Sequence, residues 1–172
     1  IMKTAVIVDS VRTGLAKSFR GGFNMTRPDE MLAHILNATL ERNPNLPPEA
    51  VEDIIMGCGN PEGAQGHNVG RNAAVLSNLP ITTGGTTINR YCSSGMQSIS
   101  MAASQIMAGC YDTVIAGGAE TISMMQGKQN MDNFVNERLA EKSPGIYYPM
   151  GMTAEVVAKR YNVSREAQDE YA

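Results

Sequence analysis

Three cysteines and two histidines are the side chains of this sequence best suited to covalent or acid–base chemistry. Cys92 follows a β-branched run at 86–89 and precedes a long stretch of small apolar residues at 93–109. A thiol at the N-terminus of a helix lies at the positive end of the helix dipole, which favours the thiolate. Unpaired N–H groups of the first turn would also stabilise an oxyanion on an attacked thioester. The local pattern alone leaves a nucleophile and an inert buried thiol equally open.

The remaining candidates have weaker surroundings. Cys58 stands between two glycines after a predicted strand, and we interpret it as a buried small residue rather than a second reactive thiol. Cys110 follows the predicted helix, at the end where the dipole disfavours a thiolate, so a structural role is expected. His34 falls within a predicted helix and suits packing, whereas His67, in a loop, could reach a ligand. Neither histidine has a partner at the spacing of a metal site or dyad, and no metal is expected.

Composition and glycine spacing exclude several other classes of protein. The chain has 14 Lys and Arg against 17 Asp and Glu, so its net charge of -3 gives no electrostatic basis for binding nucleic acid. No apolar run nears the length of a membrane span. The glycines fit no dinucleotide or phosphate-loop pattern, and we expect no cofactor. An odd number of cysteines without a C-x-x-C pair indicates a reducing compartment, so a cytoplasmic protein is predicted.

Short β-type runs alternate with helical patterns along most of the chain, which predicts an α/β fold with a mainly parallel sheet. Strands are expected at 4–8, 51–56, 86–89 and 113–116, and helices at 28–43, 69–77, 93–109, 153–161 and from 164 onward. The helix at 93–109 has no charged residue on any face, so we expect it to be buried all round. Its methionines at positions 96, 101 and 107 are interpreted as core filling.

The composition changes near residue 121, where a polar and irregular stretch begins and runs to Pro149. We therefore predict one domain at 1–120, which carries Cys92, and the start of a second at 121–172. The last predicted helix has only two turns, no C-cap glycine and no following strand. This pattern is expected of a chain that is cut short.

Motifs spread over the whole sequence resemble those of thiolases, the acyl-CoA C-acyltransferases. They are N-R-Y-C-S-S-G-M-Q-S-I at 89–99, A-G-G-A-E-T-I-S-M at 116–124, D-S-V-R-T-G at 9–14, M-G-M-T-A-E at 150–155 and S-R-E-A-Q-D at 164–169. The resemblance implies the first half of a layered α/β/α/β/α fold with a buried central helix. It also makes Cys92 the nucleophile that takes an acyl group from a 3-oxoacyl-CoA and passes it to CoA.

The resemblance implies further features of substrate, partner and mechanism. Tyr148 and Pro149 before Met150 resemble the degradative 3-ketoacyl-CoA type more than the acetoacetyl-CoA type, and Met150 becomes a candidate substrate contact. A homodimer or homotetramer is implied, with strand 86–89 at the dimer interface. The family's G-H-P histidine and C-x-G cysteine belong to the second half, and neither motif occurs here. A protein of these 172 residues alone is therefore expected to be inactive.

Two alternatives remain beside the thiolase interpretation. A β-ketoacyl synthase is similar in fold and also uses a cysteine, but its nucleophile region reads more like T-A-C-S-S-S than the sequence around Cys92. A non-catalytic thiolase-like protein that binds CoA or lipid is the other, although such a protein would typically lose the nucleophile, and Cys92 is present.

Overall fold

The computed structural model describes residues 3–172, which divide into two compact units. The first unit extends to Gln129, and the second comprises Asn130–Ala172. The predicted domain boundary at residue 120 stays a prediction. The short helix α4 (Ile122–Met125) packs within the first unit. Met125 of that helix is buried beside Gly63.

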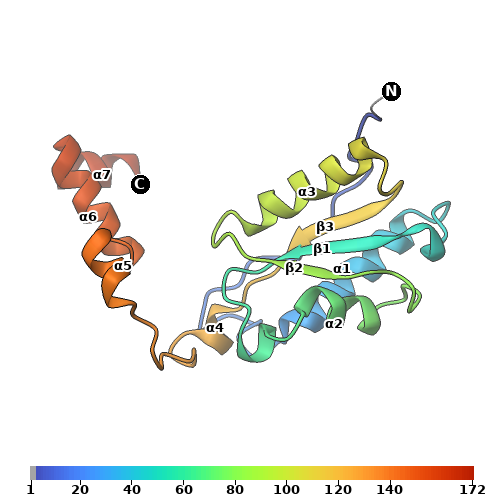
Figure 1. Ribbon diagram of the computed structural model, residues 1–172, viewed down its shortest axis with the longest axis horizontal. Coiled ribbons are helices and arrows are strands. Elements are labelled where there is room, and N and C mark those ends of the chain that lie inside the picture. Colours follow the sequence, from blue (N-terminus) through green and yellow to red (C-terminus); the bar gives the residue numbers. More distant parts are fainter. Residues whose placement is uncertain (1–2) are drawn as a thin grey trace. The chain divides into compact units, whose positions relative to one another are not determined.

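The first unit is built on a three-stranded parallel sheet (Figure 1). Its strands are β1 (Asp53–Gly57), β2 (Thr86–Ile88) and β3 (Val114–Gly118), in the order β2-β1-β3. Ile55 of the central strand pairs with Thr86 on one side and Ala116 on the other. Three of the four predicted strands and the parallel α/β class are thereby confirmed. All three strands end at the same edge of the sheet.

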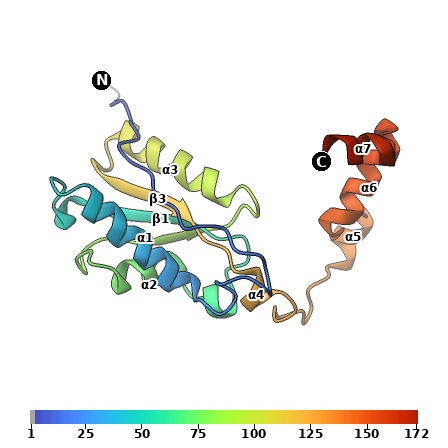
Figure 2. The same ribbon diagram turned by 180° about the vertical axis from the view of Figure 1, so that it is seen from behind.

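Helices cover both faces of this sheet (Figures 1 and 2). Helices α1 (Pro28–Arg42) and α2 (Val69–Leu76) pack together on one face, and α3 (Ser94–Ala108) lies on the other. Two single 3₁₀ turns, η1 (Pro48–Ala50) and η2 (Gly63–Gln65), precede β1 and α2. All three α-helices were predicted, α1 from its apolar stripe and α2 and α3 from their runs of small residues.

The main hydrophobic core lies between α1, α2 and the central strand. Successive residues of a strand point to opposite faces, so Ile54, Met56 and Cys58 face the leucine stripe of α1. That stripe and the residues of α2 in the same core are Leu32, Leu36, Leu40, Val69, Ala73 and Ala74. Because β1 is paired on both sides and covered on both faces, every one of its residues is buried.

The predicted strand at 4–8 is wrong. The segment before Pro28 forms no strand within the described residues, and Val6, Ile7 and Val8 are exposed. An apolar run becomes a strand only where a neighbouring backbone completes its hydrogen bonds, and none does so here. Asp9 instead holds the segment to the end of α1 through two 2.9 Å hydrogen bonds from the guanidinium of Arg42.

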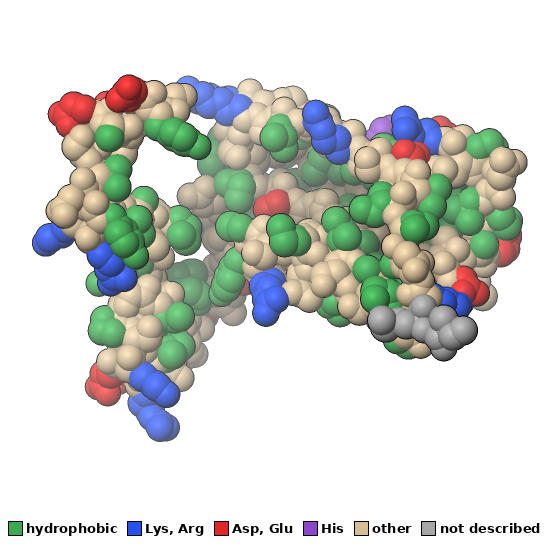
Figure 3. All heavy atoms as spheres, turned by 90° about the horizontal axis from the view of Figure 1, so that it is seen from above, with side chains coloured by type: hydrophobic (Ala, Val, Ile, Leu, Met, Phe, Trp, Pro, Cys, Tyr) green, Lys and Arg blue, Asp and Glu red, His purple; other side chains and the backbone are tan. Residues whose placement is uncertain are grey.

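Helix α3 is not buried on every side, contrary to the expectation from its sequence. The face toward the sheet is buried, and the hydroxyl of Ser98 donates 2.8 Å to the carbonyl of Gly117. On the outer face, however, Met96 is 77% exposed and Ile99 is 47% exposed. Figure 3 views the side on which α3 lies and shows hydrophobic side chains at the surface. The physical reason is that the first unit supplies one sheet to cover this helix and no second layer among the described residues.

The second unit is helical, with α5 (Glu137–Lys142), α6 (Met150–Tyr161) and α7 (Arg165–Tyr171). Helices α6 and α7 were predicted, the latter with Ser164 as its N-cap, whose side chain accepts from Ala167. The short helices α4 and α5 arise within the stretch that we expected to be irregular. Within residues 3–172 no helix has the length and apolarity needed to cross a membrane.

A buried carboxylate at the start of β1 yields a prediction about stability. Asp53 is 7% exposed, and its Oδ1 has no hydrogen-bond partner among the described residues. Burial raises the pKa of Asp53 above its usual 3.8. The folded state therefore binds the carboxyl proton of Asp53 more tightly than the unfolded state does. As a result, the free energy of unfolding falls as the pH rises through the folded-state pKa of Asp53.

Asp53→Asn removes the charge and keeps the shape. We expect it to raise the free energy of unfolding by ~1 kcal/mol at neutral pH and to change it little at about pH 3, where the aspartate is protonated in both states. Denaturant titrations of the intact protein at the two pH values measure this. A destabilised variant, or an equal gain at both pH values, would contradict the assignment.

Candidate active site

Cys92 lies in the short connection between β2 and α3. Strand β2 ends at Ile88 and α3 begins at Ser94, so the thiol is placed at the carboxyl edge of the sheet and at the helix N-terminus. Its side chain is exposed. Open α/β sheets bind their ligands at this edge, which makes the position suitable for a reacting group.

The connection is a tight turn held by its own polar groups. Tyr91 has a φ of 48°, a left-handed conformation that is unfavourable for a residue with a Cβ. The N–H of Tyr91 donates 2.8 Å to Oδ1 of Asn89, and the N–H of Arg90 donates 2.9 Å to the hydroxyl of Ser94. That hydroxyl donates in turn to the carbonyl of Tyr91. The residue before Cys92 is thus fixed from both sides.

Glycine at position 57 allows this turn to lie directly on the sheet. A Cβ at Gly57 would lie 2.4 Å from the carbonyl carbon of Ser94 and 2.6 Å from the nitrogen of Gly95. These neighbours are backbone atoms, which cannot move aside as a flexible side chain can. The end of β1 therefore sets how closely the start of α3 approaches the sheet.

The first turn of α3 also presents free donors. Among the described residues we find no acceptor for the backbone N–H groups of Gly95 and Met96, as expected for the first turn of a helix. Such groups bind negative charge. The exposed thiol and these donors together form the arrangement that the sequence predicted around Cys92.

The other two cysteines lie in different surroundings. Cys58 is 1% exposed, and burial, with a contribution from the nearby carboxylate of Glu120, raises the pKa of its thiol to about 11. Its prediction as a buried small residue is confirmed. Cys110 is exposed and follows Gly109, the left-handed residue that ends α3, so it lies at the opposite end of this helix from Cys92.

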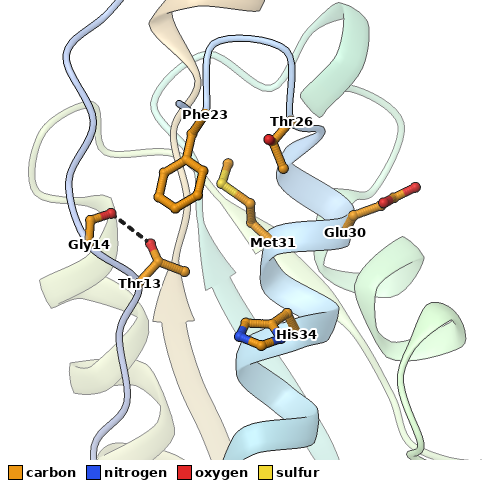
Figure 4. Close-up of a pocket in the computed structure, with 7 residues that line it drawn as sticks. All are labelled: Thr13, Gly14, Phe23, Thr26, Glu30, Met31 and His34. Atoms are coloured by element: carbon orange, nitrogen blue, oxygen red, sulfur yellow. Dashed lines mark hydrogen bonds between the residues drawn. The ribbon is translucent and has the colours of Figure 1, made fainter. Parts of the chain in front are cut away.

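The two histidines lie in separate places. His34 is exposed on α1 and lines a pocket of about 400 Å³ with Thr13, Gly14, Phe23, Thr26, Glu30 and Met31 (Figure 4). His67 has a φ of 57° in the loop before α2, and its Nδ1 lies 3.2 Å from Oδ1 of Asn72. Within residues 3–172 the Cys92 sulfur receives no hydrogen bond from either histidine, so the described part of the chain brings no base to it.

Met150 belongs to the second unit. It is the first residue of α6, is exposed, and lines a groove of about 390 Å³ between α6 and α7. Its expected role as a substrate contact stays a prediction.

Sequence reasoning missed a cluster of hydrogen bonds beside the turn, between the exposed Glu120 and the buried Gln65 and Gly59. The carboxylate of Glu120 accepts a 2.6 Å hydrogen bond from the N–H of Gly59 and another from the side-chain amide of Gln65. Glu120 lies inside the motif at 116–124, which was the one available signal. No local pattern links it to Gln65, which the fold brings to it.

Comparison with known proteins agrees with the resemblance found in the sequence. The family model described as "Thiolase, N-terminal domain" matches residues 5–172. The chain belongs to the thiolase family. This membership confirms the thiolase-like α/β fold predicted for the N-terminal half.

Individual thiolases match over nearly the whole chain. The chain is 48% identical to a 3-ketoacyl-CoA thiolase of Bacillus subtilis and 40% identical to one of Aliivibrio salmonicida, and 99% of it is aligned in both cases. The crystal structure of the Bacillus anthracis acetyl-CoA acetyltransferase has a TM-score of 0.80 and 32% identity over 98% of the chain. The alignments cover 43%, 44% and 45% of these three relatives, so the chain spans less than half of their length.

The close approach at Gly57 yields a prediction for this thiolase domain. Gly57→Ala forces the start of α3 away from the sheet, and we expect a loss of about 1–3 kcal/mol in the free energy of unfolding. Gly95→Ala is the matched control, since a Cβ there has nothing within 4 Å. Alanine is the better helix former, so the control should be more stable by up to about 1 kcal/mol. Equal stability of the two variants in thermal unfolding would contradict the close-packing account.

Proposed function

We propose that this chain carries the nucleophile of a 3-ketoacyl-CoA thiolase and that Cys92 is that nucleophile. The observation that supports the proposal best is the placement of an exposed thiol in a tight turn, at the N-terminus of α3 and the carboxyl edge of the sheet. Of the three cysteines, only Cys92 combines exposure with the positive end of a helix dipole.

The proposed reaction proceeds in two half-reactions through an acyl-enzyme. The Cys92 thiolate attacks the 3-oxo carbon of the substrate, the C2–C3 bond breaks, and the acetyl-CoA carbanion takes up a proton. The thiolate of free CoA then attacks the Cys92 thioester, which releases the shortened acyl-CoA and restores the Cys92 thiol. Free N–H groups at the start of α3 are suited to stabilising negative charge beside the acylated sulfur.

Proton transfer in both half-reactions requires a base. The resemblance assigns this role to a histidine and a second cysteine of the family's second half, and the described residues place no alternative beside Cys92. A protein of these 172 residues should therefore at most accept an acyl group on Cys92, without sustained turnover.

The degradative type is favoured over the acetoacetyl-CoA type by two observations. The relatives with 48% and 40% identity are named 3-ketoacyl-CoA thiolases, whereas the acetyl-CoA acetyltransferase is 32% identical. The Tyr148-Pro149-Met150 sequence supports the same choice. The β-ketoacyl synthase alternative is disfavoured by the family match over residues 5–172.

The proposal also includes an oligomeric state and a cellular location. β2 is an edge strand of the sheet, paired only with β1 within the described residues, and its free edge suits symmetric pairing with a second copy. A homodimer or homotetramer is proposed on this basis. All three cysteines are free thiols, which is typical of proteins in a reducing compartment and supports the cytoplasm as the location.

Replacement of Cys92 tests the proposed function. In the intact enzyme Cys92→Ser should lower the kcat of thiolysis on the order of 10³-fold or more, because a hydroxyl is a much weaker nucleophile at neutral pH. CoA thioesters should still bind, since the volume changes little. Cys110→Ser, the exposed cysteine at the other end of α3, serves as control and should keep full activity. Near-normal thiolysis by Cys92→Ser would refute the covalent mechanism. CoA binding without any acyl transfer by the unaltered intact protein would instead favour the non-catalytic CoA- or lipid-binding alternative.

A further inference from the structure

The loops at the carboxyl ends of β1 and β3 are joined by two polar side chains, Glu120 and Gln65. The carboxylate of Glu120, just beyond β3, accepts 2.6 Å from the N–H of Gly59, just beyond β1. It also accepts from the amide of Gln65, in η2. Glu120 thereby links the end of β3 to two positions of the segment after β1, which lie 61 and 55 residues away in the sequence.

Gln65 is fully buried, and its amide oxygen and nitrogen are both engaged. The nitrogen donates to Glu120 and, at 2.7 Å, to the carbonyl of Asn60, while the oxygen accepts 2.9 Å from the N–H of Thr121. A buried amide that loses such a partner retains the cost of its lost hydration. Glu120 and Gln65 therefore hold one another in a single arrangement.

This cluster contacts the turn that carries the nucleophile. A Cβ at position 59 would lie 2.8 Å from Oε2 of Glu120 and 3.5 Å from the carbonyl oxygen of Tyr91. Gly59 therefore lies between the Glu120 carboxylate and the backbone carbonyl of Tyr91, the residue before Cys92. The carbonyl of Tyr91 also accepts from the N–H and the hydroxyl of Ser94, so it fixes the start of α3 as well.

We propose that Glu120 is a positioning residue that acts with Gln65 to hold the loop at 58–60 against Tyr91 and so sets the place of the Cys92 thiol. This proposal rests on the proposed function, because it concerns the geometry of that nucleophile. The carboxylate does not touch Cys92 itself. It acts through the backbone of Gly59 and Tyr91.

The chain supplies a matched control at the opposite end of the sheet. Oε2 of Glu52 accepts from the backbone N–H groups of Asp112, at 2.5 Å, and Thr113, at 3.2 Å. Glu52 is therefore also a carboxylate just outside the sheet that receives backbone hydrogen bonds, but it precedes β1 and lies away from the nucleophile. Glu52→Gln and Glu120→Gln make the same chemical change at two ends of one sheet.

The test compares the two variants in the intact enzyme. Glu120→Gln replaces the carboxylate with an amide, whose NH₂ group cannot accept hydrogen bonds from Gly59 and Gln65. The kcat should fall on the order of tenfold, because the thiol is misplaced. The KM should change little, because the substrate site is still present. Alkylation of Cys92 by iodoacetamide without substrate, mapped by mass spectrometry, should slow by several-fold in the same variant. Glu52→Gln should leave both quantities unchanged.

Glu120→Asp is the second variant, for the case that Glu120→Gln does not fold. It keeps the negative charge but shortens the side chain, which moves the carboxylate oxygens away from their donors. The kcat and the rate of Cys92 alkylation should fall as in Glu120→Gln. The positioning proposal is overturned if a folded Glu120 variant matches Glu52→Gln in kcat and in alkylation rate. It is also overturned if kcat and KM change together in proportion to lost stability. Cys92→Ser, run in the same assay, separates this failure from a failure of the proposed function, since an active Cys92→Ser enzyme would refute the latter alone.

Discussion

Direct contact between the end of β1 and the start of α3 is the constraint on which the rest of the site depends. At Gly57 the sheet approaches the backbone of Ser94 so closely that no side chain fits between them. This contact fixes the first turn of α3, and the turn fixes Tyr91 and Cys92. The buried core around β1 gives that contact a rigid base, because β1 is paired on both edges and covered on both faces.

The same edge of the sheet gives two nearby cysteines opposite properties. Cys58 continues the core face of β1, where burial and the charge of Glu120 raise the pKa of its thiol. Cys92 lies beyond the core at a helix N-terminus, where its side chain is exposed. The difference in burial between them therefore separates a structural thiol from a candidate nucleophile at one edge of the sheet.

The sequence predicted those parts of the fold whose signals are local. Short apolar or β-branched runs indicated β1, β2 and β3, apolar stripes indicated α1 and α6, and runs of small residues indicated α2 and α3. The run at 4–8 carried the same signal but lacks a paired neighbour, and the signal itself cannot report that. The role of Glu120 was equally invisible, since its partners Gly59 and Gln65 lie 61 and 55 residues away in sequence. Cys92 could be singled out as a candidate because its strand–turn–helix setting is contained within a dozen residues, but the choice between a nucleophile and an inert thiol came from the resemblance to thiolases.

The central claim is that an acyl group resides on Cys92 during the reaction, and trapping that group tests it most directly. The intact enzyme is mixed with an acyl-CoA in the absence of free CoA, quenched in acid and digested, and its cysteine peptides are weighed. The account predicts the mass of one acyl group on the peptide that contains Cys92, removed again when CoA is added before the quench. An acyl group on the peptide of Cys58 or Cys110, or thiolysis without any acylated peptide, would contradict it.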